Sequence, residues 1–159
     1  MKKLVIFYSF EGNTRHIAEN IAEAVGADLL ELKPKKDVSS SGFMKFFWGG
    51  RQVVLGKKPE LNEFDKNPED YDVIFIGTPV WAFTYAPALR SFFSKICIKN
   101  KKIALFCCNG GNKGKTFDAM REELKDNHIL GEIEFVEPIK GEQGKASMAR
   151  QWALDMIKK

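Results

Sequence analysis

The chain has 159 residues, of which 44% are hydrophobic and 29% are charged, and its formal net charge is +4 at pH 7. These values are typical of one globular domain whose core is large enough to fold without disulfides or metal ions. They exclude a disordered or fibrous chain, and no apolar run is long enough to cross a membrane.

The cysteines and the charge pattern indicate the compartment of the protein and limit its possible partners. Cys97, Cys107 and Cys108 form an odd set without a Cys-x-x-Cys pair, which argues against a disulfide framework or a zinc site and indicates a reducing cytoplasm. The apolar run after Lys2 and Lys3 is too short for a signal peptide. Basic residues occur in short clusters that alternate with acids, so we expect no nucleic acid as a partner. From the apolar runs and the cysteines we expect no membrane and no metal ion either.

Strand-like and helix-like segments alternate along the chain. The predicted strands are residues 3–8, 28–32, 72–77, 102–107 and 133–136, and the predicted helices are residues 13–25, 87–96, 115–125 and 145–157. Two of these strands, 72–77 and 102–107, are continuously apolar, as central strands covered on both faces are. The alternation predicts an α/β fold, a doubly wound three-layer sandwich with a five-stranded parallel sheet.

Residues 38–60 interrupt this alternation. A Ser- and Gly-rich stretch precedes the aromatic segment 43–51, which contains Phe43, Phe46, Phe47 and Trp48. One interpretation is a helix that packs its aromatic side chains on the sheet. The other is a lid or partner surface beside a ligand.

The turn after the first predicted strand is a candidate anion site. Such a turn at a helix start directs several backbone N–H groups and the positive end of the helix dipole to one point, which favours a phosphate. The turn lacks the pattern of a dinucleotide loop or a Walker loop and holds no cation, so we expect neutral donors. Its candidate residues are Ser9, Phe10, Glu11, Gly12, Asn13 and Thr14.

The loop after the third predicted strand is unusually aromatic. Trp81, Phe83 and Tyr85 fall within five residues, and either they fold back on the core or they stack on a flat ligand. Because ligands of open parallel sheets bind beyond the carboxyl ends of the strands, this loop is a second part of the candidate site. Its candidate residues are Thr78, Pro79, Val80, Trp81, Ala82 and Phe83.

The loop after the fourth predicted strand offers backbone rather than side chains. Its glycines let peptide groups approach a planar ligand and bond to the edge of its ring. The sequence Gly114-Lys115-Thr116 resembles the end of a Walker loop, but Asn109 stands where the first Gly of that pattern belongs, so a nucleotide hydrolase is disfavoured. The candidate residues here are Cys108, Asn109, Gly110 and Gly111.

Together, the three loops offer a phosphate site, an aromatic platform and a backbone rim. A phosphorylated planar heterocycle fits all three, and flavin mononucleotide (FMN) fits best. The chain also resembles the flavodoxins, whose phosphate loop reads Thr/Ser-x-Thr-Gly-Asn-Thr and matches at Ser9, Gly12, Asn13 and Thr14. The family's Gly-x-Pro-Thr-Trp stretch, with the Trp stacked on the flavin, corresponds to residues 77–81. The resemblance covers essentially the whole chain, 1–159, as a single flavodoxin-like FMN-binding domain of the short-chain kind.

The chain departs from the family pattern in three places. Glu11 replaces a phosphate-binding hydroxyl and can contribute only through its backbone N–H. The third loop carries Lys113 and Lys115 instead of acidic residues and a ring-stacking Tyr, and the whole chain is basic where flavodoxins are acidic. Lysines near the ring attract the reduced, anionic flavin, so we expect a less negative reduction potential than in acidic flavodoxins.

The resemblance implies a cytoplasmic electron carrier that exchanges one or two electrons with redox partner proteins and has no catalytic residues of its own. The alternative is an NAD(P)H-dependent FMN reductase of quinone or nitro substrates, favoured by the basic charge and the third loop. A receiver-type signalling domain is disfavoured, because the third strand ends in Gly77 and Thr78 rather than in a carboxylate. We expect a monomer or a weak homodimer.

Overall fold

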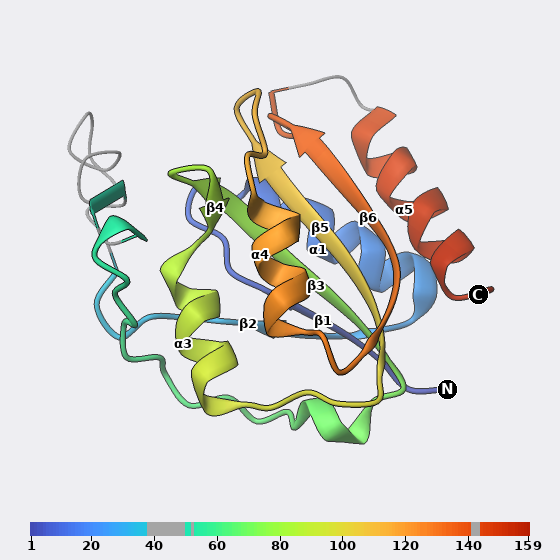
Figure 1. Cartoon of the computed structure of the whole chain (residues 1–159). Coiled ribbons are helices and arrows are strands. Elements are labelled where there is room, and N and C mark those ends of the chain that lie inside the picture. The colour runs from blue at the N-terminus through green and yellow to red at the C-terminus, as the bar shows by residue number, and fades with distance from the viewer. Residues whose placement is uncertain (38–49, 52, 141–143) are drawn as a thin grey trace.

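Five parallel strands form one sheet in the computed structural model, which describes residues 1–37, 50, 51, 53–140 and 144–159 (Figure 1). The strands are β1 (Lys3–Phe7), β2 (Asp28–Glu31), β3 (Val73–Trp81), β5 (Lys102–Asn109) and β6 (His128–Val136). Their order is β2-β1-β3-β5-β6. In this register Gly77 lies between Phe7 of β1 and Phe106 of β5. The predicted α/β fold with a five-stranded parallel sheet is therefore confirmed.

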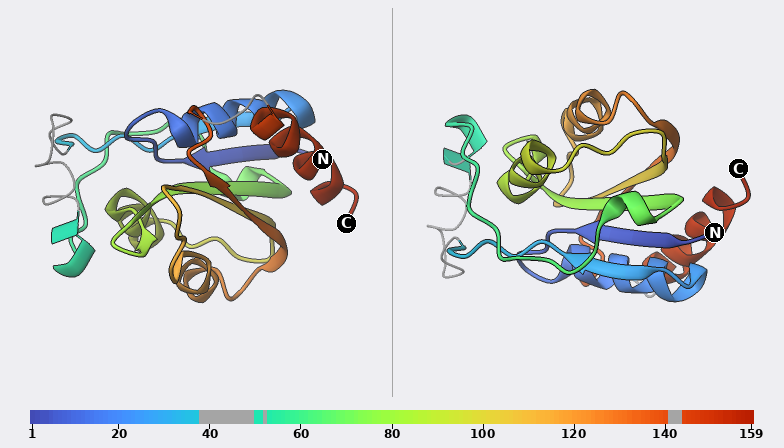
Figure 2. Two further views of the ribbon diagram at one scale, coloured as in Figure 1. Left: turned by 90° about the horizontal axis from the view of Figure 1, so that it is seen from above. Right: turned by 90° about the horizontal axis from the view of Figure 1, so that it is seen from below.

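Helices cover both faces of the sheet, which gives the three layers seen in Figure 2. On one face lie α1 (Asn13–Val25) and α5 (Gly144–Met156), and on the other lie α3 (Pro87–Lys95) and α4 (Thr116–Glu123). A short 3₁₀ helix, η1 (Pro68–Asp70), precedes β3. Each face has its own apolar core, in which alternate residues of a strand serve opposite faces, as Val5 and Ile6 do.

Local sequence explains where the helices begin and end. The α1 helix begins after Gly12, whose φ is 96°, and ends at Gly26, whose φ is 62° and whose N–H donates to Ala22 O. The α3 helix has Pro87 in its first turn, where a missing N–H costs nothing. At Gly77 a Cβ atom would lie 2.1 Å from the Phe106 ring, so only Gly permits this packing of β3 against β5.

Three segments differ from the sequence-based prediction. The β3 strand continues to Trp81 and turns back into a short antiparallel strand, β4 (Thr84–Tyr85), so the second predicted loop is mostly a β-hairpin. The β6 strand begins at His128 rather than at residue 133. The aromatic segment 43–51 lies outside the described residues apart from Gly50 and Arg51.

No helix within the described ranges is both long enough and apolar enough to span a bilayer.

Candidate functional site

A cavity of about 560 Å³ opens at the carboxyl ends of β1, β3 and β5. This is the edge where open parallel sheets bind their ligands. Twelve of the sixteen predicted site residues line it: Ser9, Phe10, Glu11, Asn13, Thr14, Pro79, Val80, Trp81, Ala82, Cys108, Asn109 and Gly110. The structure thus brings the three predicted loops together around one space.

The turn between β1 and α1 is shaped to hold an anion. Gly12 takes the left-handed backbone that bends the chain into the helix, and Ser9 Oγ accepts the N–H of Arg15 at 3.1 Å. As in any α helix, the first N–H groups, here those of Asn13 and Thr14, have no acceptor within the helix. The Arg15 guanidinium is bonded to Glu31. The donors of the turn itself are therefore neutral, in agreement with the sequence-based expectation.

Thr14 provides the clearest sign of a missing ligand. Its side chain is 1% exposed, and its Oγ1 has no hydrogen-bond partner of ordinary geometry among the described residues. The Cys108 thiol lies beside it, and burial raises the pKa of that thiol to about 12 while the Thr14 hydroxyl lowers it. A buried hydroxyl without a good partner costs about 1–3 kcal/mol. Since Thr14 lines the cavity, a bound oxyanion would remove this cost.

Trp81 forms the aromatic wall of the cavity. Its ring meets Tyr8 edge to face at 5.6 Å between centroids and Phe10 at 5.5 Å. The Tyr8 hydroxyl donates to Asp37 at 2.8 Å. The pKa of Tyr8 is raised, mainly by burial and to a lesser extent by the Asp37 carboxylate. The indole is therefore held in a fixed orientation, with part of its surface left on the cavity.

The other two aromatic residues of the predicted second loop do not line the cavity. Tyr85 is buried, and its hydroxyl donates to Glu123 at 2.9 Å. Phe83 is 64% exposed at the tip of the hairpin. The two sequence-based alternatives thus apply to different residues: Tyr85 folds back on the core, whereas Trp81 faces the cavity.

The hairpin that carries Trp81 has a strained turn clamped by the third loop. Ala82 and Phe83 both have positive φ angles, 47° and 65°, which are rare for residues other than Gly. Phe83 O accepts the N–H of Lys115 at 2.8 Å, and a Cβ on Gly114 would lie 2.5 Å from Phe83 O. The clamp holds two of the three loops of the site in a fixed relation.

Four predicted site residues do not line the cavity: Gly12, Thr78, Phe83 and Gly111. Gly12 acts through its backbone angle, and Phe83 through its carbonyl. Thr78 is fully buried, where its hydroxyl accepts the N–H of Ala86 at 3.0 Å and donates to Pro79 O at 2.8 Å. These two hydrogen bonds stabilise the hairpin, so Thr78 supports the fold and does not contact the cavity.

The third loop presents an open rim. Asn109 Oδ1 accepts the N–H of Gly111 at 2.8 Å, which fixes the turn. Within the described part of the chain, a Cβ atom at Gly110 or Gly111 would meet nothing within 4 Å. Lys113, which we expected near a bound ring, lies outside the cavity wall and pairs with Glu134 at 3.6 Å. Lys115 is exposed and also lies outside the wall.

Sequence reasoning missed three residues that line the cavity: Gly50, Glu137 and Lys140. Gly50 belongs to the interrupted region 38–60. Glu137 and Lys140 follow β6, the fifth strand of the parallel sheet. The rule that sites lie beyond the carboxyl ends of strands covers this loop as well, and it was the signal that could have found them.

These groups fit a phosphorylated planar molecule. The α1 turn and the unpartnered Thr14 hydroxyl suit an oxyanion, Trp81 offers an apolar face, and the rim at Gly110 offers peptide groups. A cavity of about 560 Å³ lies within the size range of small-molecule and cofactor sites.

Comparison with known proteins defines the class. A family model described as flavodoxin matches residues 2–137. The flavodoxin-like domain-containing protein BilS of Clostridioides difficile (strain CD3) is 31% identical over 137 residues. That match covers 82% of this chain, and the chain spans 63% of the length of BilS.

Solved structures share the fold. A flavoprotein from Lactobacillus acidophilus NCFM, in complex with FMN, has a TM-score of 0.73 and 22% identity over 87% of this chain and 96% of its own. A WrbA-like flavodoxin from Agrobacterium tumefaciens has a TM-score of 0.64 and 15% identity over 98% and 94%. Oxidised flavodoxin 2 from Bacillus cereus has a TM-score of 0.61 and 16% identity over 99% of both chains.

The sheet order and the site at its carboxyl edge thus define an α/β protein of the doubly wound class. With the family model matching most of its length, the chain belongs to the flavodoxin family.

Proposed function

We propose that the chain is a single domain that binds FMN non-covalently in the cavity and carries electrons between redox partner proteins. The phosphate would bind at the turn of residues 9–14, the ring would lie against Trp81, and its polar edge would meet the backbone of residues 108–111. The observation that carries the proposal is the buried Thr14 hydroxyl at the start of α1, which lacks a hydrogen-bond partner of ordinary geometry among the described residues. Family membership and the FMN complex of the Lactobacillus acidophilus flavoprotein support it.

The chain's own residues would bind and orient the cofactor rather than transfer protons. FMN, when bound, supplies reversible uptake of one or two electrons. Tyr8 and Phe10 hold Trp81 edge to face, so the indole is pre-organised as a stacking surface. The clamp between Phe83 and Lys115 keeps the stacking loop and the rim at a fixed separation.

The experiment is a spectrum of freshly purified protein, followed by titration of the apoprotein with FMN. Flavin absorption that stays with the protein through gel filtration, and saturable quenching of FMN fluorescence, are the expected results. Colourless protein that leaves FMN fluorescence unchanged contradicts the proposal.

A reductase remains the second candidate, because the structure leaves the rim of the site open. No described residue has an atom within 4 Å of a Cβ placed at Gly110 or Gly111, which favours room for a second planar molecule. The formal charge of +4 favours an anionic nicotinamide donor. Anaerobic mixing of holoprotein with NADPH separates the two functions. Rapid loss of the flavin absorption band supports a reductase, and an unchanged spectrum supports a carrier.

An ion pair in the third loop affects the reduction potential that we expect for bound FMN. Lys113 is paired with Glu134, and neither Lys113 nor Lys115 lines the cavity, so their effect on a bound ring is weaker than the sequence implies. Among the described residues that line the wall, the acidic and basic side chains are those of Glu11, Glu137 and Lys140, and the Cys108 thiol is kept neutral by its raised pKa. We propose a cytoplasmic protein with a potential only modestly less negative than that of acidic flavodoxins, measured by potentiometry of the holoprotein.

A further inference from the structure

The loop between β6 and α5 is attached to the proposed phosphate site from a distant part of the chain. The N–H of Ile139 donates to Asn13 Oδ1 at 3.1 Å, a contact that spans 126 positions. The Ile139 side chain also reaches Gly12, where a Cβ atom would lie 3.5 Å from its Cδ1. The N–H of Glu137 donates to Asn109 O at 2.9 Å, so the same loop is tied to the third loop as well.

This attachment decides what Asn13 offers to a ligand. Its Oδ1 already accepts the Ile139 N–H, so the amide NH₂ group is the part left to act as a donor. Asn13 lines the cavity together with Ser9 and Thr14, and the buried Thr14 hydroxyl lacks a partner of ordinary geometry within the described part of the chain. The loop after β6 therefore turns Asn13 into a donor at the point where an oxyanion would bind.

The same loop brings a cation to the cavity wall. Lys140 Nζ lies 3.2 Å from Glu137 Oε1, and both residues line the cavity. Their side chains are 79% and 49% exposed, and exposed ion pairs of this kind are weak, at about 0–1 kcal/mol. A phosphate dianion is a stronger partner for an ammonium group than one carboxylate, so little opposes an exchange.

We propose that Lys140 binds the phosphate of the ligand, and that it exchanges its ion pair with Glu137 for one with the phosphate. The inference rests on the proposed function, since it names the charge that completes the FMN site. Glu137 is held in a left-handed backbone conformation, φ 40°, by its bond to Asn109, and it keeps Lys140 at the wall until the ligand arrives. The site then combines neutral donors from α1 with one cation from the loop after β6.

The test compares dissociation constants for FMN and riboflavin, which differ by the phosphate, in apoprotein at low ionic strength. Lys140→Met should weaken FMN binding about tenfold, as loss of one charge-assisted contact does, and change riboflavin binding less than about twofold. Lys158→Met is the matched control, because Lys158 forms an i,i+3 pair with Asp155 at 3.3 Å and is 71% exposed, but does not line the cavity. It should leave both affinities unchanged.

Two further variants separate charge from shape. Lys140→Arg keeps the charge and should keep FMN binding within about threefold of the wild type. Glu137→Gln removes the competing carboxylate and should tighten FMN binding about threefold, an effect that disappears when Lys140→Met is also present.

The possible outcomes are distinct. If wild-type protein prefers FMN to riboflavin but Lys140→Met does not reduce that preference, the role of Lys140 is wrong and FMN binding stands. If wild-type protein binds neither flavin, or binds both equally, the proposed function itself fails.

Discussion

Thr14→Val should change apoprotein stability and FMN affinity in opposite directions. The change replaces a hydroxyl by a methyl group of similar volume, at a helix position where Thr and Val have similar propensities. In the apoprotein it removes a buried hydroxyl without a good partner, whose cost is about 1–3 kcal/mol. Because the Cys108 thiol lies beside it as a weak partner, we take the low end, a gain of about 1 kcal/mol.

With bound FMN the sign reverses. The hydroxyl would then donate to a charged phosphate, and such a bond contributes about 1.5–3 kcal/mol. Thr14→Val should therefore weaken FMN binding by a factor of about 10–100 and leave riboflavin binding nearly unchanged. The free-energy gain in the apoprotein should raise its melting temperature by about 2–4 °C for a chain of this size.

Thr116→Val is the matched control. Thr116 is also a buried Thr at the start of a helix, but its hydroxyl donates to Lys113 O at 2.6 Å, and it does not line the cavity. Its replacement should lower the melting temperature and leave FMN affinity unchanged. Calorimetry of both apoproteins and fluorescence titration with both flavins measure these effects. The reasoning is refuted if Thr14→Val destabilises the apoprotein as Thr116→Val does and binds FMN as tightly as the wild type.

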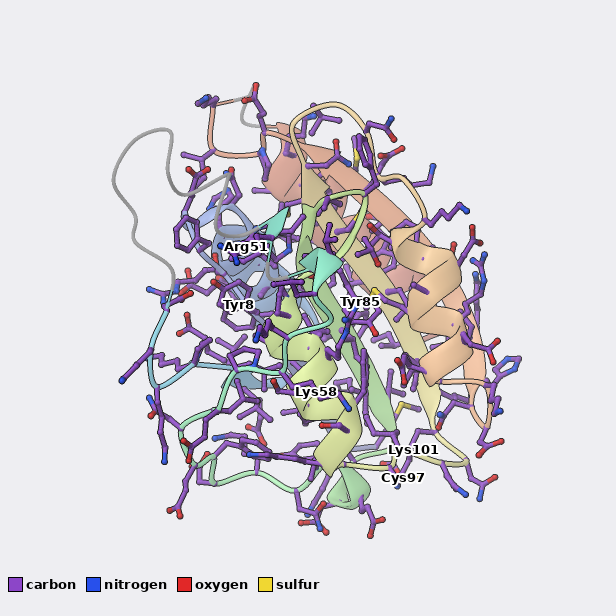
Figure 3. The ribbon with its side chains drawn as sticks, turned by 60° about the vertical axis from the view of Figure 1, so that its left-hand side comes forward. Tyr8, Arg51, Lys58, Tyr85, Cys97 and Lys101 are labelled. Atoms are coloured by element: carbon purple, nitrogen blue, oxygen red, sulfur yellow. The ribbon has the colours of Figure 1, made fainter. Side chains whose placement is uncertain are left out.

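The remaining predictions concern the hairpin clamp and the burial of the cysteines. Gly114→Ala should lower the free energy of unfolding, measured by urea denaturation, by about 2–3 kcal/mol, because the new Cβ would lie 2.5 Å from Phe83 O and the φ angle of Gly114 is 54°. The control is Gly110→Ala, whose new Cβ would meet no described residue and should cost less than about 1 kcal/mol. Equal losses of stability in the two variants would contradict the clamp. Cys97 is exposed and lies with Lys101 at the end of the sheet remote from the cavity (Figure 3). It should react with a thiol reagent in native protein, whereas buried Cys108 should react only after unfolding. Burial raises the pKa of the Cys108 thiol from 9.0 to about 12, so the stability contributed by the buried, neutral thiol is complete below pH 9 and is lost as the pH rises through 12. Fast labelling of Cys108 in native protein would contradict this burial.

The regular part of the fold follows from the sequence because its signals are local. Apolar periodicity and Gly26 predict α1 to the residue, and the continuous apolar runs predict the central strands. The start of β6 was missed because Gly131 and Glu132 separate Ile129 and Leu130 from the predicted run 133–136 and so interrupt the apolar pattern of this edge strand. The hairpin was missed because Ala82 and Phe83 are not turn formers, and tertiary contacts hold them at positive φ.

The site could be predicted only in part, because some of its contacts join distant parts of the chain and leave no local signal in the sequence. The turn at residues 9–14 has a local signature, and twelve of the sixteen predicted residues line the cavity. Thr78 was placed in the site because sequence does not show that its hydroxyl is used by Ala86. The contact between Ile139 and Asn13 spans 126 positions and has no local signal, so this contact could not be predicted, although the strand-end rule pointed to the loop that makes it.

The most direct test of the central claim is a fluorescence titration of FMN, and in parallel riboflavin, with apoprotein. A phosphate site at the start of α1 beside an indole wall predicts quenching of FMN that saturates at one flavin per chain. It also predicts that riboflavin binds at least about tenfold more weakly, since the phosphate contacts are lost. Absence of saturable quenching, or equal affinity for the two flavins, would contradict the account.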